Sequence, residues 1–359
     1  MTYPDGHEGW LVTGYAAARA LLTDDRFSAR AELRRSPLST EPPQPALPGV
    51  LSGYDPPEHT RYRRLLIGQF TVRRMNLLTD RIQEIAEERL DLMVENGPPA
   101  DLKQLYALPI PSLVICELLG VPYEERSLFQ QQTEVMFDLG SSVEVMMGAV
   151  GAVTALVADI AERKRAEPTD DLLSGLVAGG ELTGEELANI GMALLVAGHE
   201  TTANMITLGT FALLSHPEQS AALRADPARA DRAVEELMRY LTVSHIGPFR
   251  TALEDVEFEG QAIKAGDSVT VSLPAANRDP GHFPDPGRFD IERENVRHLG
   301  FGYGVHQCLG QQLARIEMRV ALTALLRRFP DLRLAVPSEE IEPQPGMAVY
   351  GVRSLPVAW

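Results

Sequence analysis

Residues 298–326, HLGFGYGVHQCLGQQLARIEMRVALTALL, combine a glycine-rich turn, one cysteine and a helical pattern. The turn contains Phe301, Gly302 and Gly304, and Cys308 follows it. An amphipathic helix is expected to start at the cysteine, because apolar residues recur there at helical spacing: Leu309, Leu313, Ile316 and Val320. Amide N–H groups at a helix N-terminus stabilise a thiolate. The pattern therefore indicates a metal-ligating thiolate at Cys308, with glycines on both sides that admit a flat, bulky group.

Three other interpretations of this loop compete. Buried structural cysteines lie in apolar helices, as Cys116 does in PSLVICELLG, and not in glycine-rich turns. A dinucleotide-binding loop would need glycine where the chain has Gln307. A zinc site could use His298, His306 and Cys308, but it lacks a fourth ligand. Haem with an axial thiolate remains.

Residues 182–218, LTGEELANIGMALLVAGHETTANMITLGTFALLSHPE, predict a single long helix. Thr183 and Glu186 form a capping-box pattern, and the helical text continues to Pro217. About 32 residues at 1.5 Å each give roughly 48 Å. The helix is apolar on nearly every side, so we expect it to be buried.

The AGHETT segment at 197–202 places an acid and two hydroxyls in the middle of this apolar helix. In one interpretation Thr201 and Thr202 bond back to helix carbonyls and Glu200 reaches the surface. In the other, the helix is locally opened beside a cofactor, and Glu200 and Thr201 handle protons. The residues alone leave both open.

Composition excludes several partners. Lys+Arg 33 against Asp+Glu 50 leave a formal charge of −17, which repels nucleic acid and anionic lipid. Two cysteines make no disulfide framework, which favours a reducing cytoplasm. The first residues lack a signal-peptide pattern, and uncharged apolar runs such as 145–158 and 201–215 are too short to span a bilayer. We expect no membrane anchor.

Helical patterns dominate the chain, so a mainly α fold with small β-sheets is expected, as a single domain over 1–359. A Pro-rich loop at 32–57 is a lid candidate. Residues 10–13 predict a strand, 256–273 a hairpin, and the tail after Pro330 a similar structure. The expected helices are 15–22, 58–69, 79–95, 110–119, 124–139 and 145–167.

The loop FGYGVHQCLGQQLAR resembles the cysteine-ligand loop of the cytochrome P-450 haem-thiolate monooxygenases. The matching positions are Phe301, Gly304, Cys308, Gly310 and Ala314. AGHETT is similar to the oxygen-activation helix of that family. The resemblance covers essentially the whole chain and is strongest to the soluble actinobacterial enzymes of secondary metabolism.

Other motifs follow in the family's order. Glu236 and Arg239 in EELMRY match its Glu-x-x-Arg pair, and Arg288 in FPDPGRF matches the third member of that structural network. DPPEHTRYRRLL is similar to the helix that binds the haem propionates, with His59 and Arg63 on one face. The chain starts at the family's first sheet, without several dozen residues that members usually carry upstream.

The resemblance implies haem b with Cys308 as the axial iron ligand. The implied propionate ligands are His59, Arg63, Arg250 and His306, and the loop positions Phe301, Gly304, Gly310 and Ala314 complete the cofactor site. Glu200 and Thr201 are the implied catalytic pair, which delivers protons, whereas the Thr202 hydroxyl is expected to bond back to its own helix.

The implied reaction inserts one atom of O2 into a C–H bond or an alkene of a largely apolar small molecule. Two alternatives are a peroxide-driven peroxygenase, which would replace the acid–alcohol pair, and a haem-binding sensor, which has no use for it. Beyond the Pro-rich loop, the expected pocket residues are Leu194, Ala197, Val243 through Ile246, and Met347 through Val349.

No flavin or nicotinamide motif is present, so electrons are expected from a ferredoxin and its reductase. Arginines around the propionate helix suggest a basic docking patch on the proximal side of the haem: Arg61, Arg64, Arg73 and Arg74. We expect a cytoplasmic monomer.

Overall fold

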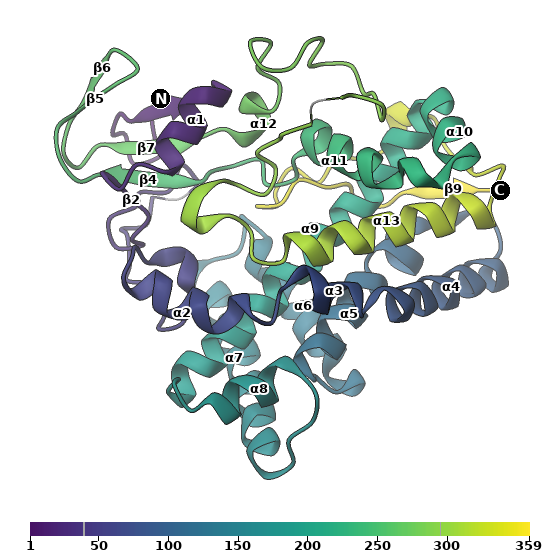
Figure 1. The fold of residues 1–359 in the computed structure, drawn as a ribbon, viewed down its shortest axis with the longest axis horizontal. Coiled ribbons are helices and arrows are strands. Elements are labelled where there is room, and N and C mark those ends of the chain that lie inside the picture. The colour runs from purple at the N-terminus through teal and green to yellow at the C-terminus, as the bar shows by residue number, and fades with distance from the viewer. Residues whose placement is uncertain (39, 295) are drawn as a thin grey trace.

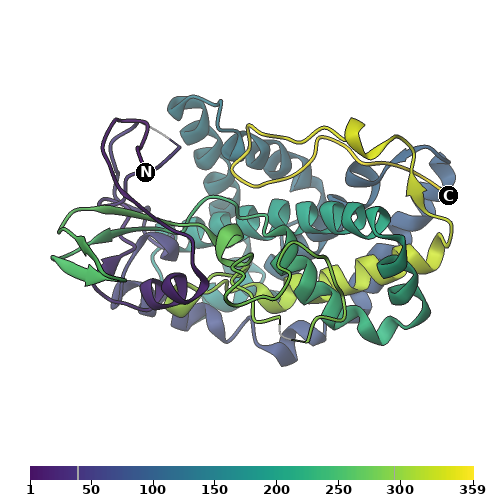
Figure 2. The ribbon, with the colours of Figure 1, turned by 90° about the horizontal axis from the view of Figure 1, so that it is seen from above.

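The computed structural model describes residues 1–38, 40–294 and 296–359. Helices fill the middle and right of the molecule, the four-stranded sheet and the hairpin of β5 (Val256–Phe258) and β6 (Gln261–Ile263) lie near the N-terminus at the left, and β9 (Pro356–Ala358) lies beside the C-terminus at the right (Figure 1). The two chain ends lie toward opposite ends of the long axis, as the view from above also shows (Figure 2). The prediction of a mainly α fold with small β-sheets is confirmed.

Helix α9, Gly184–Ser215, is the long predicted helix, and its capping box is present. The Thr183 hydroxyl accepts the Glu186 N–H at 3.1 Å, and the Glu186 carboxylate accepts the Thr183 N–H at 2.8 Å. These bonds satisfy amides that would otherwise be unpaired at the helix start. Pro217 begins α10, and most side chains of α9 are buried.

The other helices form around α9, and α5, α7 and α13 make the most extensive packing against it. The helices before α9 are α1 (Tyr15–Leu22), α2 (Glu58–Ile67), α3 (Val72–Asn76), α4 (Thr79–Asn96), α5 (Pro109–Leu119), α6 (Arg126–Phe137), α7 (Val143–Ala166) and α8 (Leu172–Gly179). Those after it are α10 (Pro217–Ala225), α11 (Ala230–Leu241), α12 (Leu273–Ala276) and α13 (Gln311–Arg328).

The strands make three small sheets. One has the order β1 (Trp10–Val12), β7 (Ser268–Val271), β4 (Phe249–Ala252), β2 (Phe27–Ser28), with β1 and β7 parallel. The second has the order β3 (Ala100–Asp101), β9 (Pro356–Ala358), β8 (Arg333–Leu334). The third is the hairpin of β5 (Val256–Phe258) and β6 (Gln261–Ile263). Its two-residue turn needs positive φ at Glu259 (51°) and Gly260 (74°), which matches the twist of a tight hairpin.

Two sequence expectations need correction. The predicted hairpin covers only 256–263, because β7 leaves it to pair with β1 and β4. Helix α13 begins at Gln311, three residues after Cys308.

Helix α7 is long and apolar enough to cross a membrane by length and composition alone, with 28% of its most apolar window buried. It packs against α6, α8 and α9, and its last turn carries charged residues.

The main core joins segments that are far apart in the chain. It extends from Tyr62 in α2 to Val357 in β9 and includes buried side chains of α4, α5, α7, α9 and α13. A smaller core lies between α1 and the sheet of β1, β7, β4 and β2. The glycine-rich loop before α13 lies where these two cores meet, since Leu299 belongs to the smaller and Leu313 to the larger.

Candidate functional site

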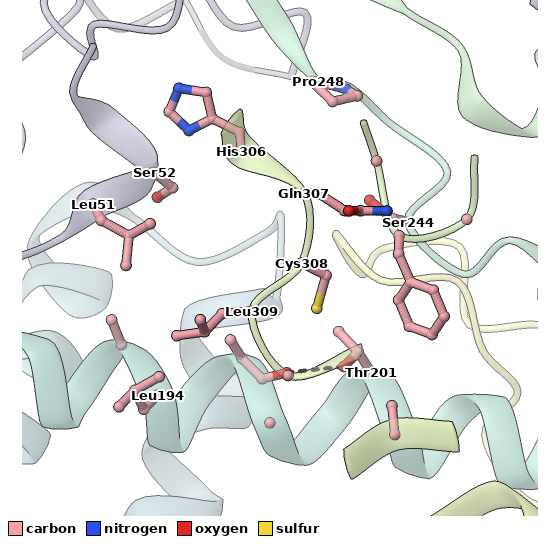
Figure 3. Close-up of a pocket in the computed structure, with 18 of the residues that line it drawn as sticks. Leu51, Ser52, Leu194, Thr201, Ser244, Pro248, His306, Gln307, Cys308 and Leu309 are labelled. Carbon is pink, nitrogen blue, oxygen red and sulfur yellow. Dashed lines mark hydrogen bonds between the residues drawn. The ribbon is translucent and has the colours of Figure 1, made fainter. Parts of the chain in front are cut away.

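A cavity of about 550 Å³ lies between the Cys308 loop and the middle of α9. Figure 3 shows Cys308, Gln307 and Leu309 on one wall, Leu194 and Thr201 of α9 below them, and Leu51 and Ser52 of the Pro-rich loop at the side. The exposed lining is mostly apolar. Sequence positions from 22 to 318 therefore meet around one cavity.

Cys308 faces the cavity with its sulfur (Figure 3). Its N–H donates to the Phe301 carbonyl at 2.9 Å, which closes the glycine-rich turn. The side chain is open to the cavity but surrounded by protein, and this burial raises the pKa of its thiol. The Gly310 N–H and the charge of Arg63 act in the opposite direction. The expected lowering of the Cys308 pKa by amides at a helix start is therefore present, but burial outweighs it. Helix α13 begins three residues after Cys308 and not at the cysteine itself.

Two glycines of the turn have different roles. A Cβ on Gly304 would lie 2.5 Å from the Leu22 carbonyl oxygen, and its φ is +75°, so only glycine fits there. Gly304 does not line the cavity, which corrects its expected place at the cofactor. Gly310 does line it, and no protein atom lies within 4 Å of where its Cβ would be. The space beside the Gly310 backbone is therefore part of the cavity.

Basic side chains gather at the edge of the cavity between the Cys308 loop, α2 and β4. Arg63, Arg250 and His306 line it. His59 is 1% exposed, its ring lies 4.3 Å from that of His306, and both its nitrogens are buried without a hydrogen-bond partner. Sequence reasoning missed Arg34, which also lines the cavity, because no periodicity or motif marks it in the Pro-rich loop.

Burial lowers the pKa of every group in this cluster. The pKa of Arg250 falls to about 10 and that of His306 to about 3, through desolvation first and neighbouring positive charge second. Desolvation and Arg63 also lower the pKa of His59. Buried cations and unpartnered donors of this kind are expensive unless an anion accompanies them. The cluster therefore fits a group that carries carboxylates.

The AGHETT segment divides between the cavity and the protein interior. Thr201 lines the cavity and its hydroxyl donates to the Ala197 carbonyl at 2.8 Å, the dashed bond in Figure 3. Thr202 also lines the cavity, and in the described part of the chain its hydroxyl makes no bond to a helix carbonyl. The hydrogen bond to a helix carbonyl that we expect for Thr202 is therefore made by Thr201 instead.

Glu200 does not line the cavity and is 7% exposed, so it neither meets Thr201 nor reaches solvent as expected. Successive helix residues are about 100° apart, which turns Glu200 away from the side that Thr201 occupies. Its carboxylate accepts from Asn204 Nδ2 at 3.0 Å. Burial raises the pKa of Glu200, against the opposing charge of Lys103.

The apolar wall is only partly where the sequence placed it. Leu194, Ala197, Val243 and Ile246 line the cavity. Met347 and Val349 do not, although both are buried. Backbone bonds hold their segment elsewhere: Ala348 donates to Phe137 of α6, and Tyr350 donates to Val243, so the segment lies behind the wall.

The Glu-x-x-Arg pair is fully buried. Arg239 donates to both Glu236 oxygens at 2.7 and 2.8 Å, and to the carbonyls of Asn277, Pro286 and Arg288. The side chain of Arg288 is 66% exposed and lies near Asp290, so it is not the third member of the network. Arg293 takes that place, because the turn after Arg288 carries its guanidinium back to Glu236 at 3.2 Å.

A second group of polar side chains supports Phe301. Glu235 accepts from Arg315 at 2.6 Å, and the Arg315 guanidinium lies 4.5 Å from the centre of the Phe301 ring. His298 uses one ring nitrogen on Glu235 and accepts the Gly300 N–H with the other. His298 therefore has no nitrogen left for zinc. Within the residues that the structure describes, no three acidic, histidine or cysteine side chains form a metal-binding cluster.

The four arginines expected to form a docking patch divide into two pairs. Arg61 bonds to Glu186 at 2.6 Å and Arg64 to Glu181 at 3.1 Å, at the start of α9. Arg73 and Arg74 lie on α3, which packs against α13. The expectation of one patch is wrong for Arg61 and Arg64, because carboxylates from α9 and the turn before it neutralise them.

A thiol facing a large apolar cavity, beside buried cations, defines the class of haem-thiolate oxidoreductases. Comparison with known proteins agrees. The family model described as Cytochrome P450 matches residues 151–350. Cytochrome P450 105C1 of a Streptomyces species is 54% identical over 358 residues, 99% of this chain and 91% of that protein. Cytochrome P450 monooxygenase PikC of Streptomyces venezuelae is 43% identical over 362 residues, 99% of this chain and 86% of that protein.

A solved structure gives the same result for the fold. The LnmA cytochrome P450 hydroxylase, from the leinamycin biosynthetic pathway of Streptomyces atroolivaceus, superposes with a TM-score of 0.91 at 44% identity. The match covers 100% of this chain and 92% of that one. The chain belongs to the cytochrome P450 family, whose members bind haem through a cysteine thiolate. The family resemblance seen in the sequence is confirmed.

Proposed function

We propose that this protein is a monooxygenase that hydroxylates or epoxidises a largely apolar small molecule in secondary-metabolite biosynthesis, with O2 and electrons from a ferredoxin-type partner. One observation carries the proposal: a single cavity is bounded by Cys308, by a cluster of basic side chains that has no bonded carboxylate in the described residues, and by an apolar wall on α9. Its relatives among Streptomyces biosynthetic enzymes support the metabolic role.

The residues around the cavity fit haem b. In the proposal Cys308 ligates the iron, and His59, Arg63, Arg250 and His306 bind the two propionates, whose charges would offset the cost of burying that cluster. Phe301, Gly310 and Ala314 line the same space. When bound, a thiolate-ligated haem supplies the activation of dioxygen, because the thiolate pushes electron density that favours O–O cleavage.

The side chains on α9 do two jobs in this proposal. Leu194 and Ala197 keep water from the reacting atoms and hold an apolar substrate by burial. The Thr201 hydroxyl, fixed by its bond to Ala197, orients a water in the cavity through its remaining acceptor capacity. Glu200 stores the proton, since burial keeps its carboxyl protonated at higher pH than an exposed glutamate. A proton then passes from Glu200 to the Thr201 site after the Glu200 side chain turns.

Electron delivery by a ferredoxin uses the face of α3 and α13 in this proposal. Arg73 is exposed there, and Arg74 is half-buried with the fully exposed carboxylate of Asp170 at 3.9 Å. An acidic ferredoxin would meet positive charge at this face although the whole chain carries −17. A single domain over 1–359, a monomeric state and a cytoplasmic location complete the proposal, the first supported by a main core that joins α2 to β9.

The test uses the ferrous carbonyl spectrum. Haem-loaded wild-type protein should show the strongly red-shifted Soret band of thiolate-ligated haem, and Cys308→Ser should lose it. Cys116→Ser is the matched control, because Cys116 is buried in α5, where burial raises the pKa of its thiol to about 12. A red-shifted band that persists in Cys308→Ser would refute Cys308 as the ligand. Product formed with peroxide but not with O2 and a ferredoxin system would favour the peroxygenase.

A further inference from the structure

Arg34 is a cavity-lining cation that the haem site leaves without an assigned role. It lies in the Pro-rich loop, and its Nη1 donates to the Ser52 carbonyl. Ser52 and Leu51 stand between His306 and Leu194 in Figure 3. The guanidinium is therefore placed where the basic edge of the cavity meets its apolar wall.

The backbone on either side of Arg34 is anchored. The Thr251 hydroxyl of β4 donates to the Leu33 carbonyl at 2.8 Å. The Ala31 N–H donates to the Gly53 carbonyl at 3.0 Å, which joins the two ends of the loop. Arg34 thus has a fixed position beside Arg250, unlike an arginine on a free loop tip.

The hydrogen-bonding capacity of Arg34 is almost unused. Its bond to Ser52 is 3.5 Å long, beyond the usual range for N–H···O bonds. Two acids act on Arg34 through their charge, Asp55 and Glu32. Asp55 already accepts from the Ser28 hydroxyl at 2.5 Å and the Ala29 N–H at 2.7 Å, and Glu32 pairs with Arg30. In the described part of the chain Arg34 forms no ion pair. Burial lowers the pKa of Arg34, so an anion at this place would offset the cost of its desolvation.

In the proposed function the haem propionates account for the other basic side chains at the edge of the cavity, and Arg34 has no role there. Two propionates present four oxygens, and four side chains from α2, β4 and the Cys308 loop already surround their place. Arg34 comes instead from the Pro-rich loop, which also contributes Leu51 to the cavity wall. A planar guanidinium with free N–H donors can bind a carboxylate through two parallel N–H···O hydrogen bonds.

We propose that Arg34 binds a carboxylate at one end of an otherwise apolar substrate. This deepens the proposed function and rests on it: the substrate class is an amphipathic organic acid, whose carboxylate pairs with Arg34 while its apolar body lies along Leu51 and Leu194 on the way to the reacting centre.

The experiment measures binding through the low-spin to high-spin shift of the ferric Soret band, without turnover. Decanoic acid and decanamide are the probes, because they share an apolar chain and differ in charge at pH 7.5. The wild-type protein should bind the acid about 10- to 100-fold more tightly, the range for hydrogen bonds to a charged group. Arg34→Gln should abolish this preference and leave the affinity for the amide unchanged. Arg34→Lys should retain part of it.

Arg35→Gln is the matched control, because Arg35 is the next residue, pairs with Asp5 at 2.5 Å and does not line the cavity. Equal affinity of wild-type protein for both probes, or an unchanged preference in Arg34→Gln, would overturn the proposal. So would loss of haem from Arg34→Gln, which would assign Arg34 to a propionate. A wild-type protein with the red-shifted carbonyl band but no acid preference would refute this inference alone, whereas absence of that band would refute the proposed function.

Discussion

Arg293 donates from Nε to both carboxylate oxygens of Glu236, at 3.3 and 3.2 Å, and so completes the buried network that Arg239 begins. We expect Arg293→Gln to lower the free energy of unfolding by about 2 kcal/mol, because it removes hydrogen bonds to a buried carboxylate. Arg239→Gln should cost about 3–5 kcal/mol, since it leaves that carboxylate without its main partner.

Arg288→Gln is the control for this pair of variants. Its exposed side chain makes no bond to Glu236, so the change should stay within about 0.5 kcal/mol. Chemical denaturation of the wild type and the three variants measures these differences in the free energy of unfolding. If Arg288→Gln were as destabilising as Arg293→Gln, the assignment of Arg293 to the network would be wrong.

Thr201→Ala should separate reductant consumption from product formation. Substrate binding and reduction precede proton delivery, so the variant should keep the Soret band and consume reductant. Removing a positioned proton-transfer group costs about 10²- to 10⁴-fold in the step it serves, and reductant should then yield hydrogen peroxide. The measurement is the amount of product and of hydrogen peroxide formed per molecule of reductant consumed.

Thr202→Ala and Glu200→Gln extend this experiment. Thr202 also lines the cavity, and in the described part of the chain its hydroxyl makes no bond to a helix carbonyl, so Thr202→Ala should also lower the yield of product per reductant. Glu200→Gln keeps the bonding partner of Asn204 but cannot release a proton, and should slow turnover with little effect on substrate affinity. Full coupling in Thr201→Ala would require another proton route.

His59→Leu should change haem affinity and apoprotein stability in opposite directions. Both nitrogens of His59 are buried without a partner in the protein, so removing them should leave the apoprotein as stable or more stable. A haem propionate would lose one donor, which should weaken haem binding about 10-fold. Thermal unfolding of the apoprotein and haem transfer to apomyoglobin measure the two effects. A destabilised apoprotein with unchanged haem affinity would make His59 structural.

Glu186→Gln should destabilise the protein in a pH-dependent way. Its bond to Arg61 and the Thr183 N–H hold the pKa of Glu186 at about 2, below the usual value of 4.5. The charge therefore contributes stability that is fully present above pH 4.5 and is lost as the pH falls through 2. Glutamine keeps the capping box, so the difference in Tm between wild type and variant should be present at pH 7 and shrink below pH 4.5. A difference independent of pH would exclude the ion pair as its cause.

Arg73→Gln with Arg74→Gln should slow reduction by an acidic ferredoxin, whereas Arg64→Gln should not. Arg64 is paired with Glu181 at 3.1 Å, whereas Arg74 lies 3.9 Å from Asp170 and Arg73 forms no ion pair in the described part of the chain. Added salt should slow the wild-type rate, because exposed charges more than about 8–10 Å apart are screened at physiological ionic strength. Stopped-flow reduction over a range of salt concentrations tests this. An equal, salt-independent rate in all variants would place the docking face elsewhere.

The local sequence determined the helix boundaries and the turn before Cys308. The capping box of Thr183 and Glu186, the proline that ends α9, and the glycine-rich turn before Cys308 depend on bonds within a few residues, which a sequence displays directly. Most helices consequently lie within a few residues of their predicted bounds.

Only the tertiary structure decided which side chains share the cavity. The family resemblance indicated Arg288 as the third member of the Glu236 network, but the path of the turn that follows it places Arg293 there instead. Helix rotation turns Glu200 away from Thr201 although they are adjacent. Arg34 lines the cavity beside Leu33, whose carbonyl is held by Thr251, a residue 218 positions after Leu33. Such choices depend on contacts between distant segments, and no local pattern records them.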